Sequence, residues 1–320
     1  DAGEDIYLCA PPTPTQLNGN IDGDYLNFSW SPTTGMSGST SLTPTVSVSQ
    51  TITYVLRARA ADYSNNLIVN GDFGGGNSDF SSDYIFSPGD LVPEGVYDVL
   101  DNPQNSHPGF SPCQDHTGGG NMLAVNGSGT PNSNVWCQTI TVMPNTQYVF
   151  QCWVATLVAS SPAILQFSIN GGLLGPAFNA PGSTCNWVRF FSTWNSGSNT
   201  SATICIVNQN TVLGGNDFAL DDLLFAPTCE VTDSVTVNII NVAAAASPAV
   251  SMLPCEGAEV TLSGVGSSTG DNVTYEWDTP NGNIVSGANT LSPVVNAAGT
   301  YTITVTYEEN GAICTKTASV

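Results

Sequence analysis

The chain has 320 residues, of which four are Lys or Arg and 26 are Asp or Glu, giving a formal net charge of −22 and only 9% charged residues. So few cations cannot neutralise a nucleic-acid backbone, and long salt-bridged helices need many more charges, so nucleic-acid binding and coiled coils are excluded. Hydrophobic residues make up 41% of the chain, enough to build cores, and no apolar run is long enough to span a membrane.

Two similar stretches stand at opposite ends of the chain. The first holds Trp30 in YLNFSW and Tyr54 in TITYVLRA, and the second holds Trp277 in VTYEW and Tyr301 in TYTITVTY. The Tyr follows the Trp at the same spacing in both stretches. Apolar and polar residues alternate with the period of a β-strand. We therefore expect two copies of a small antiparallel, immunoglobulin-like sandwich.

The first copy is interrupted. In the second copy the last strand begins at Cys314, soon after Tyr301, whereas the matching segment of the first copy begins only at Cys229, far beyond Tyr54. The extra length in the first copy equals the span 66–227, which we interpret as an insertion. Surface loops tolerate such insertions. We predict three domains: a discontinuous sandwich (1–65 plus 228–241), an inserted domain (66–227) and a second sandwich (242–320).

The insertion contains about eight short strand-like segments separated by Gly, Pro, Asn and Ser, a pattern typical of a two-sheet jelly roll. The predicted fold class is thus all-β: two immunoglobulin-like sandwiches, the first split by an inserted β jelly roll.

Nine cysteines are scattered without a CxxC pair, which favours disulfides in an exported protein over a zinc or redox site. The two copies predict bonds between the first and last strands of each sandwich. These are Cys9 with Cys229, and Cys255 with Cys314.

Five cysteines lie in the insertion, so at least one of them is unpaired or pairs outside it. One arrangement joins Cys113 to Cys137 and Cys185 to Cys205, leaving Cys152 as a buried thiol. A tight turn at residues 144 and 145 would instead place Cys137 opposite Cys152, and this pairing stays open.

Several segments resemble known families. NLIVNGDF (66–73), VWCQTITVMPNTQYVFQCWV (135–154) and FALDDLLF (218–225) resemble the carbohydrate-binding-module jelly rolls found beside secreted glycosidases. The flanking segments DAGEDIYLC, WSPTTGMS and TCEVTDSVTVNI resemble immunoglobulin-like or polycystic-kidney-disease-like repeats of giant adhesins exported by the type 9 secretion system of Bacteroidota. The resemblance implies an extracellular location at a cell surface.

The same resemblance implies a structural Ca²⁺ between the first and last strands of the jelly roll. The matching positions are Asp72, Asp221 and Asp222, with Asn121 as a further contributor. Carboxylate and carbonyl oxygens suit Ca²⁺. The alternative is that these Asp residues only form turns.

Glycan binding would need exposed aromatic rings framed by polar side chains. The candidates are Trp136, Trp153, Trp187, Trp194 and Tyr84. The alternative is that these rings fill the core of the jelly roll.

No nucleophile elbow, zinc-binding helix or phosphate loop occurs, and both histidines, His107 and His116, stand in one Gly- and Pro-rich loop. We therefore expect a non-enzymatic piece of a longer, processed chain. It would be a structural or adhesive segment of a large bacterial surface appendage, a filament, stalk or hook-like assembly used for adhesion, gliding or prey capture. Its partners would be copies of itself or neighbouring chains, with a glycan as a further candidate. The alternative is a glycan-binding accessory domain of a secreted polysaccharide-degrading enzyme.

Overall fold

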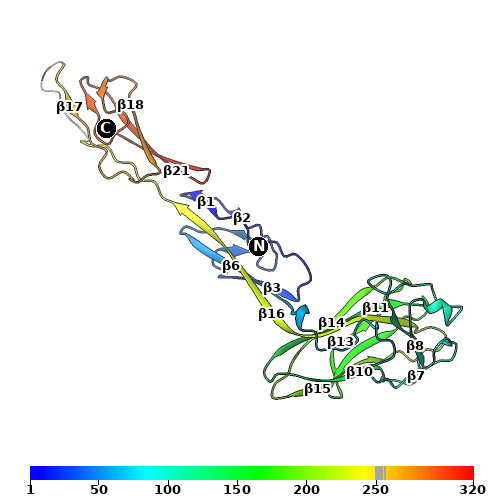
Figure 1. The fold of residues 1–320 in the computed structure, drawn as a ribbon. Helices are drawn as coiled ribbons and strands as arrows, with labels where there is room; N and C mark the ends of the chain where they lie inside the picture. Colours follow the sequence, from blue (N-terminus) through cyan, green and yellow to red (C-terminus); the bar gives the residue numbers. More distant parts are fainter. Residues whose placement is uncertain (249–254, 256) are drawn as a thin grey trace. The chain divides into compact units, whose positions relative to one another are not determined.

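The computed structural model describes residues 1–248, 255 and 257–320, and it consists almost entirely of β-strands (Figure 1). Within these residues the helical segments are two short 3₁₀ turns, Tyr63–Asn65 and Pro103–Asn105. The predicted all-β class is confirmed.

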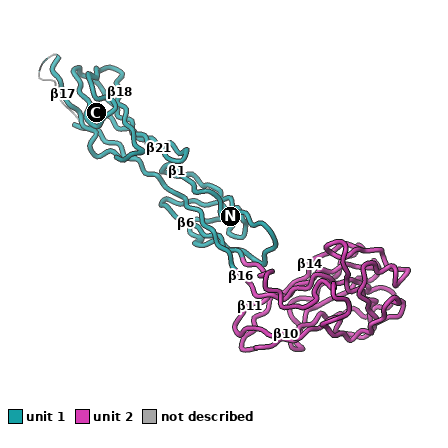
Figure 2. Tube along the Cα trace, viewed as in Figure 1, with its two compact units in different colours: residues 1–58, 230–320 teal, residues 59–229 magenta. Residues whose placement is uncertain are grey.

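The chain divides into two compact units (Figure 2). Unit 1 comprises residues 1–58 and 230–320, and unit 2 comprises residues 59–229. Strand β16 (Phe218–Ile240) begins in unit 2 and ends in unit 1. Both predicted sandwiches fall in unit 1, and unit 2 holds the predicted jelly roll.

The first sandwich of unit 1 is built on β16. Strand β1 pairs with β16 in parallel, β6 pairs with β16 on its other side, and β3 pairs with β6. A small second sheet has the order β2-β5-β4. The strands are β1 (Ile6–Cys9), β2 (Thr15–Gln16), β3 (Asn27–Ser31), β4 (Met36–Ser37), β5 (Thr45–Val46) and β6 (Ile52–Ala61). Trp30 and Tyr54 lie in the core between the sheets.

The second sandwich has two three-stranded sheets, β17-β20-β19 and β18-β21-β22. Its strands are β17 (Val260–Thr261), β18 (Val273–Asp278), β19 (Ile284–Ser286), β20 (Val294–Val295), β21 (Thr302–Glu309) and β22 (Ala312–Ser319). Trp277 and Tyr301 occupy its core.

In each sandwich the hydroxyl of the buried Tyr donates to a backbone carbonyl. The hydroxyl of Tyr54 donates to the carbonyl of Thr34 over 2.6 Å, and that of Tyr301 donates to the carbonyl of Ala297 over 2.6 Å. Each buried Tyr thereby satisfies its polar end, but the acceptors differ. Thr34 lies 20 residues before Tyr54, whereas Ala297 lies four residues before Tyr301, as in a tyrosine corner.

Unit 2 is a jelly roll of two sheets. One has the order β14-β11-β16-β9-β8-β7 and the other the order β10-β15-β12-β13. The strands are β7 (Ile85–Phe86), β8 (Val96–Leu100), β9 (Met122–Asn126), β10 (Ser133–Thr141), β11 (Gln147–Thr156), β12 (Ile164–Ile169), β13 (Gly172–Asn179), β14 (Val188–Asn195) and β15 (Ser201–Asn208).

Aromatic rings fill the space between these sheets. Phe167 stacks on Phe150 and on Phe190, with ring centroids 4.0 and 3.9 Å apart, and Trp136 is fully buried beside Phe150. Such rings bury large apolar areas, which is how a chain so poor in ion pairs stabilises a domain.

The disulfides differ from the predicted pairs. Cys9 is bonded to Cys314, while Cys229 and Cys255 are free and exposed. The register explains the first error, because Cys9 lies opposite Ile240 in the β1–β16 ladder and Cys229 precedes Ile240 by eleven residues. At roughly 3.3 Å per residue, that is about 36 Å along the strand, far beyond the reach of a disulfide.

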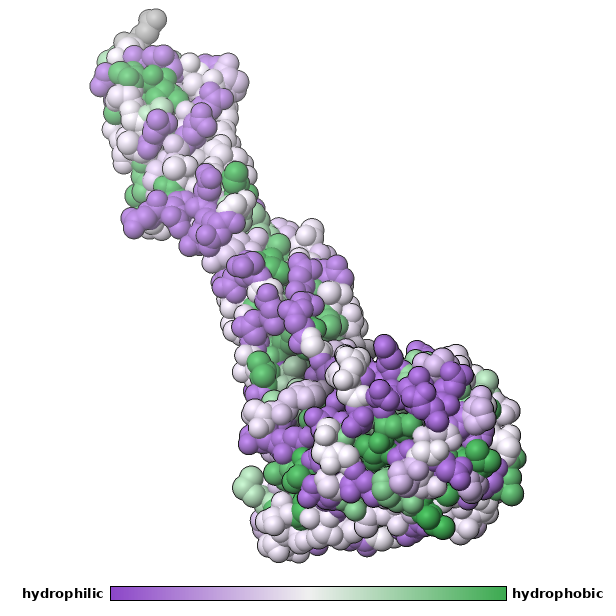
Figure 3. Space-filling view, turned by 45° about the vertical axis from the view of Figure 1, so that its right-hand side comes forward, coloured by the Kyte–Doolittle hydropathy of each residue, from purple (hydrophilic) through white to green (hydrophobic). Residues whose placement is uncertain are grey.

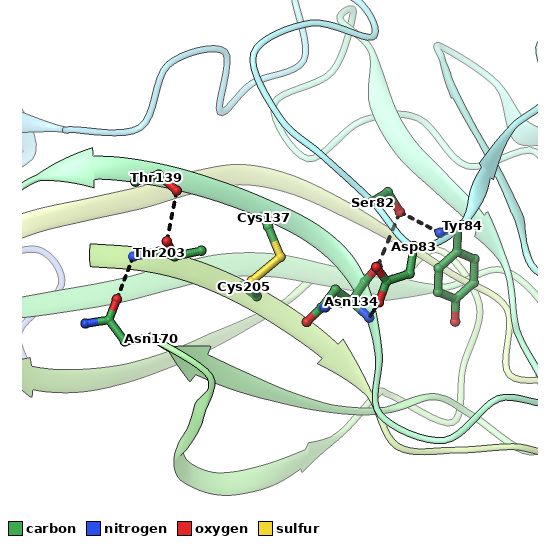
Figure 4. Close-up of a disulfide and its surroundings, with 9 residues drawn as sticks. All are labelled: Ser82, Asp83, Tyr84, Asn134, Cys137, Thr139, Asn170, Thr203 and Cys205. Atoms are coloured by element: carbon green, nitrogen blue, oxygen red, sulfur yellow. Dashed lines mark hydrogen bonds between the residues drawn. A yellow bond between two sulfur atoms is a disulfide. The ribbon is translucent and has the colours of Figure 1, made fainter. Parts of the chain in front are cut away.

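In unit 2 the bonds are Cys137–Cys205 and Cys113–Cys185. Cys137 and Cys205 are directly opposed on β10 and β15, with Cα atoms 4.2 Å apart (Figure 4). Both predicted pairs of the insertion are therefore wrong. The alternative pairing of Cys137 with Cys152 is wrong too, because Cys152 stands on β11 in the other sheet with its side chain in the core. The prediction of Cys152 as a buried free thiol is confirmed.

A buried polar network lies at one end of the jelly roll. The amide of Asn208 donates to the hydroxyl of Tyr84 and to the side-chain carbonyl of Asn216. Nearby, the carboxylate of Asp217 accepts the backbone N–H of Gly127 over 3.1 Å. Burial, reinforced by the charge of Glu94, raises the pKa of Asp217 to about 7 despite that hydrogen bond.

This raised pKa predicts a pH-dependent stability. Between about pH 4 and 7 the unfolded chain releases a proton that folded Asp217 keeps, so the free energy of unfolding falls as the pH rises through this window. Asp217→Asn should reduce the difference in bound protons between the folded and unfolded states by up to one. The free energy of unfolding of this variant should therefore fall less between pH 5 and pH 8 than that of the wild type. Denaturant titrations at both pH values measure it, with the exposed Asp101→Asn as the control. Equal slopes for the wild type and Asp217→Asn would contradict the prediction.

Candidate functional site

A groove of about 490 Å³ opens on unit 2. Its lining comes from the segment 63–72, from β11 and from β16, and it includes Gln151, Trp153 and Asp222. Green apolar areas alternate with purple hydrophilic ones on this unit in Figure 3. A groove that combines an aromatic ring with amides and carboxylates has the composition of a polar-ligand site.

The strand period of β11 supplies the groove residues. Tyr148, Phe150, Cys152 and Val154 point into the core between the sheets. The intervening side chains, such as that of Trp153, therefore point to the opposite face of the sheet. Trp153 is only partly buried there.

An irregularity in β16 brings Asp222 to the groove. The pairing of β11 with β16 shifts between Gln151 and Trp153, and Asp222 has φ of 47°, a left-handed conformation. An extra residue of this kind is a β-bulge, which redirects a side chain. The backbone is also close here, because a Cβ added to Gly71 would lie 2.4 Å from the carbonyl oxygen of Leu223.

His116 connects the bulge to the aromatic wall. Its Nδ1 lies 2.6 Å from Oδ2 of Asp222, and its ring stacks on Trp153 with centroids 3.9 Å apart and an angle of 16°. Trp187 meets the same imidazole edge-on at 6.1 Å. His116 thus covers part of Trp153 and fixes its orientation, while Trp153 still lines the groove.

The loop that carries His116 is held by covalent and polar contacts. Cys113 is bonded to Cys185, and the indole N–H of Trp187 donates to the carbonyl of Gln114. Burial raises the pKa of Asp115, but hydrogen bonds from the backbone N–H groups of residues 118–120 and from Thr117 outweigh it, so the pKa lies below its ordinary value. The turn is therefore stabilised by a charged acceptor.

Beside the groove, a polar pair and an exposed ring continue the same face. Nε of Arg189 donates to the side-chain carbonyl of Gln151 over 2.8 Å, and the guanidinium lies 4.7 Å from the ring centroid of Phe191. The register places Arg189 opposite Trp153 and Phe191 opposite Gln151. We call Trp153, Gln151, Arg189 and Phe191 the aromatic strip.

Asp221 lies just behind Asp222. It is 1% exposed and accepts the backbone N–H of His116 over 2.9 Å. Burial raises its pKa to about 7, and the charges of Asp222 and Asp115 add to this effect against two backbone hydrogen bonds. Its role is to hold the His116 loop on β16.

The predicted ligand-binding aromatics are distributed unevenly. Trp153 and Trp187 contact His116 at the groove side of the sheet. Trp136 and Tyr84 are buried in the core, where no glycan can reach them, and Trp194 packs against the core residue Phe225. The spacing of these residues in the sequence did not distinguish the two faces.

The predicted Ca²⁺ ligands are only partly brought together. Asp72 and Asp222 line the same groove, but Asp221 is committed to backbone N–H groups, and the amide of Asn121 donates towards the carbonyl of Phe73 at 3.5 Å. Across the residues that the structure describes, no group of three or more His, Cys, Asp or Glu side chains is arranged to hold a metal. The carboxylates present thus fit Ca²⁺ incompletely.

The sequence pattern did not single out Gln151, Arg189 or Phe191. RFFSTW (189–194) shows no strict alternation of polar and apolar residues, although any strand there places Arg189 and Phe191 on one face. Which of the two faces is exposed to solvent depends on which other segments pack against that strand.

Comparison with known proteins identifies the C-terminal sandwich. Residues 244–319 match the model of the PKD domain family. No curated protein sequence matches the chain significantly. Together with the disulfides, the PKD match indicates an extracellular chain.

Solved structures similar to this chain include carbohydrate-binding modules. The CBM22-1 xylan-binding domain of Paenibacillus barcinonensis Xyn10C is 13% identical with a TM-score of 0.34, covering 51% of this chain and 91% of that one. A family 16 carbohydrate-binding module-2 is 16% identical with a TM-score of 0.31, covering 50% and 99%. The CBM22-1–CBM22-2 tandem of the same Paenibacillus protein is 13% identical with a TM-score of 0.35, covering 77% and 65%. These values are too low to transfer a ligand, so binding has to be argued from the chain's own residues.

A double-mutant cycle tests the His116–Asp222 contact. The imidazole Nδ1 lies 2.6 Å from the carboxylate, so removing either side chain should cost more when its partner is present than when it is absent. Because both side chains are partly exposed (23% and 29%), we expect a coupling of about 0.5–1 kcal/mol. Unfolding free energies of His116→Ala, Asp222→Ala and the double variant measure it. Zero coupling would show that the contact does not stabilise the fold.

Proposed function

We propose that this chain is a non-enzymatic, extracellular adhesive segment of a large bacterial surface appendage, and that its jelly roll binds a glycan along the aromatic strip. The observation that carries the proposal is Trp153, held in a fixed orientation by His116 and lying next to the Gln151–Arg189 pair. Sugar rings stack their C–H faces on aromatic rings and exchange hydrogen bonds with amide and guanidinium groups.

The groove carries polar groups that are already oriented by the protein. Gln151 is 3% exposed, and its side-chain carbonyl accepts from Nε of Arg189, so it fixes the position of the guanidinium before any ligand arrives. Fixed side chains lose little conformational entropy on binding, which favours recognition. Phe191 is 41% exposed and would extend the contact to a second sugar ring.

The same groups favour binding over hydrolysis. A glycosidase needs a protonated and an ionised carboxyl group facing one bond. In this groove Asp222 is held by His116, and Asp72 accepts the backbone N–H of Gly74 over 3.1 Å. Both carboxylates therefore have structural partners, which supports a role without catalysis.

The two sandwiches of unit 1 support the proposal of a surface appendage. Tandem immunoglobulin-like sandwiches of the kind found in unit 1 are typical of rod-like surface proteins, and the type 9 secretion resemblance of the flanking segments supports export by a member of the Bacteroidota. The chain's partners would be neighbouring chains of that assembly. No helix in the described part of the chain is long and apolar enough to cross a membrane.

Glycan binding is tested on an array with the whole chain. We expect binding to at least one glycan, and Trp153→Ala and Phe191→Ala should each weaken it about tenfold or more, equivalent to roughly 1.4 kcal/mol. The matched control is Phe86→Ala, because Phe86 is exposed to a similar extent, 40%, on edge strand β7.

The array result and the oligomeric state together distinguish a surface appendage from the accessory domain of an enzyme. Binding by the wild type and Phe86→Ala but not by the strip variants supports the proposal. Binding by a protein that stays monomeric at high concentration would favour the accessory domain of a polysaccharide-degrading enzyme over the appendage. No binding to any glycan would remove the strip as a glycan site.

Calcium remains a proposal that rests on Asp72 and Asp222, the two carboxylates at the groove. If Ca²⁺ binds there, the thermal midpoint of the wild type rises when Ca²⁺ replaces chelator, because a ligand that binds only the folded state stabilises it. Asp72→Asn should abolish the rise, while Asp101→Asn should keep it. Identical midpoints with Ca²⁺ and with chelator would exclude a structural Ca²⁺ site.

The net charge of −22 on each chain makes neighbouring copies repel one another. We therefore expect assembly of the chains to weaken in low-salt buffer that contains chelator.

A further inference from the structure

One disulfide within unit 1 joins segments that are far apart in the sequence. Cys9 is the last residue of β1 and Cys314 is the third residue of β22, and their Cα atoms lie 5.3 Å apart although 305 residues separate them in sequence. Cys314 is 2% exposed. The bond is thus built into the unit rather than attached to its surface.

Each cysteine is anchored in a β-ladder of its own. Cys9 lies opposite Ile240 in the parallel β1–β16 pair, and the next residue, Ala10, donates its N–H to the carbonyl of Ile240 over 2.9 Å. Cys314 lies opposite Tyr307 in the antiparallel β21–β22 pair. The first ladder belongs to the first sandwich and the second to the PKD-like sandwich.

We propose that Cys9–Cys314 is a cross-link that carries mechanical force. A force that pulls on residues before Cys9 and on residues after Cys314 passes through the sulfur atoms, because the covalent bond is the shortest path between the two points. The hydrogen-bonded ladders between residues 10 and 313 then carry no tension. Without the bond, the force would be carried by the hydrogen bonds of the four-residue β1–β16 ladder. Because the two strands are parallel and would be pulled at opposite ends, this ladder would be loaded in shear.

The shielded part includes the whole of unit 2. Residues 59–229 lie between the two cysteines in sequence, so the jelly roll stays folded whatever force is applied at the ends. Of the 320 residues, the eight before Cys9 and the six after Cys314 lie outside the cross-linked part and can extend. At roughly 3.5 Å per residue their full extension is about 50 Å. The inference concerns mechanical protection and does not depend on glycan binding.

The pairing that the sequence pattern alone favours would act differently. Bonds Cys9–Cys229 and Cys255–Cys314 would leave residues 230–254 in the load path. That segment would add about 90 Å on unfolding, at roughly 3.5 Å for each residue. The length released under force therefore identifies which bonds exist.

Single-molecule pulling of the oxidised whole chain, held by handles fused at both ends, tests the proposal. We expect no unfolding step beyond the roughly 50 Å of the terminal residues. In the Cys9→Ser, Cys314→Ser double variant we expect unfolding steps that total about 800 Å. The force then passes through the 305 residues between positions 9 and 314, except for the 72 residues that the Cys113–Cys185 bond keeps from extending. Cys229→Ser is the matched control and should behave as the wild type, since Cys229 is free.

Two outcomes would overturn the proposal: a release of about 90 Å more in the oxidised wild type, which indicates the other pairing, or a release near 800 Å, which indicates no cross-link. Should the double variant fail to fold, non-reducing peptide mapping of the wild type decides. Trypsin leaves Cys229, Cys255 and Cys314 on one fragment, because Arg189 and Lys316 are the flanking cleavage points. A protease that cuts after Asp and Glu separates them, and a peptide pair joining Cys9 to any cysteine but Cys314 refutes the cross-link.

Discussion

The alternation of side chains along β11 is the constraint on which the rest of unit 2 depends. Phe150 and Cys152 enter the core, so Gln151 and Trp153 must face the other way. A shift of one residue would turn Gln151 into the apolar core and Phe150 to the outer face of the sheet. The core and the groove are thus two faces of one strand, and neither can be changed in register without losing the other.

A shortage of cations shapes how this protein holds its polar groups. With four Lys and Arg residues for 26 acids, most carboxylates cannot form ion pairs, and several accept hydrogen bonds from backbone N–H groups or polar side chains instead. Asp62 and Asp115 illustrate the favourable result, since hydrogen bonds lower the pKa of both. Asp217 and Asp221 illustrate the cost, because burial without a cation raises their pKa values to about 7.

Disulfide bonds supply part of the stabilisation that ion pairs supply in proteins with more cations. Cys113–Cys185 holds the loop that presents His116, and Cys137–Cys205 joins two paired strands. Cys9–Cys314 closes the long sequence loop that contains the jelly roll. Each bond sits where neighbouring segments come from distant parts of the chain, so hydrogen bonds within one hairpin could not replace it.

Strand periodicity and motif spacing, both local properties of the chain, were enough to predict the fold class, the repeated sandwich with its Trp and Tyr, and the existence of an insertion. These local patterns placed both Trp153 and Trp136 among the candidate rings. A period of two shows that a strand has two faces, but it does not show which of the two faces is buried. Only the folded chain answers that question, through the bulge at Asp222 and the loop that lays His116 on Trp153. The disulfide partners likewise emerge only from the fold. Both outcomes depend on contacts between residues about 70 to 305 positions apart, and no local pattern encodes which distant segments meet.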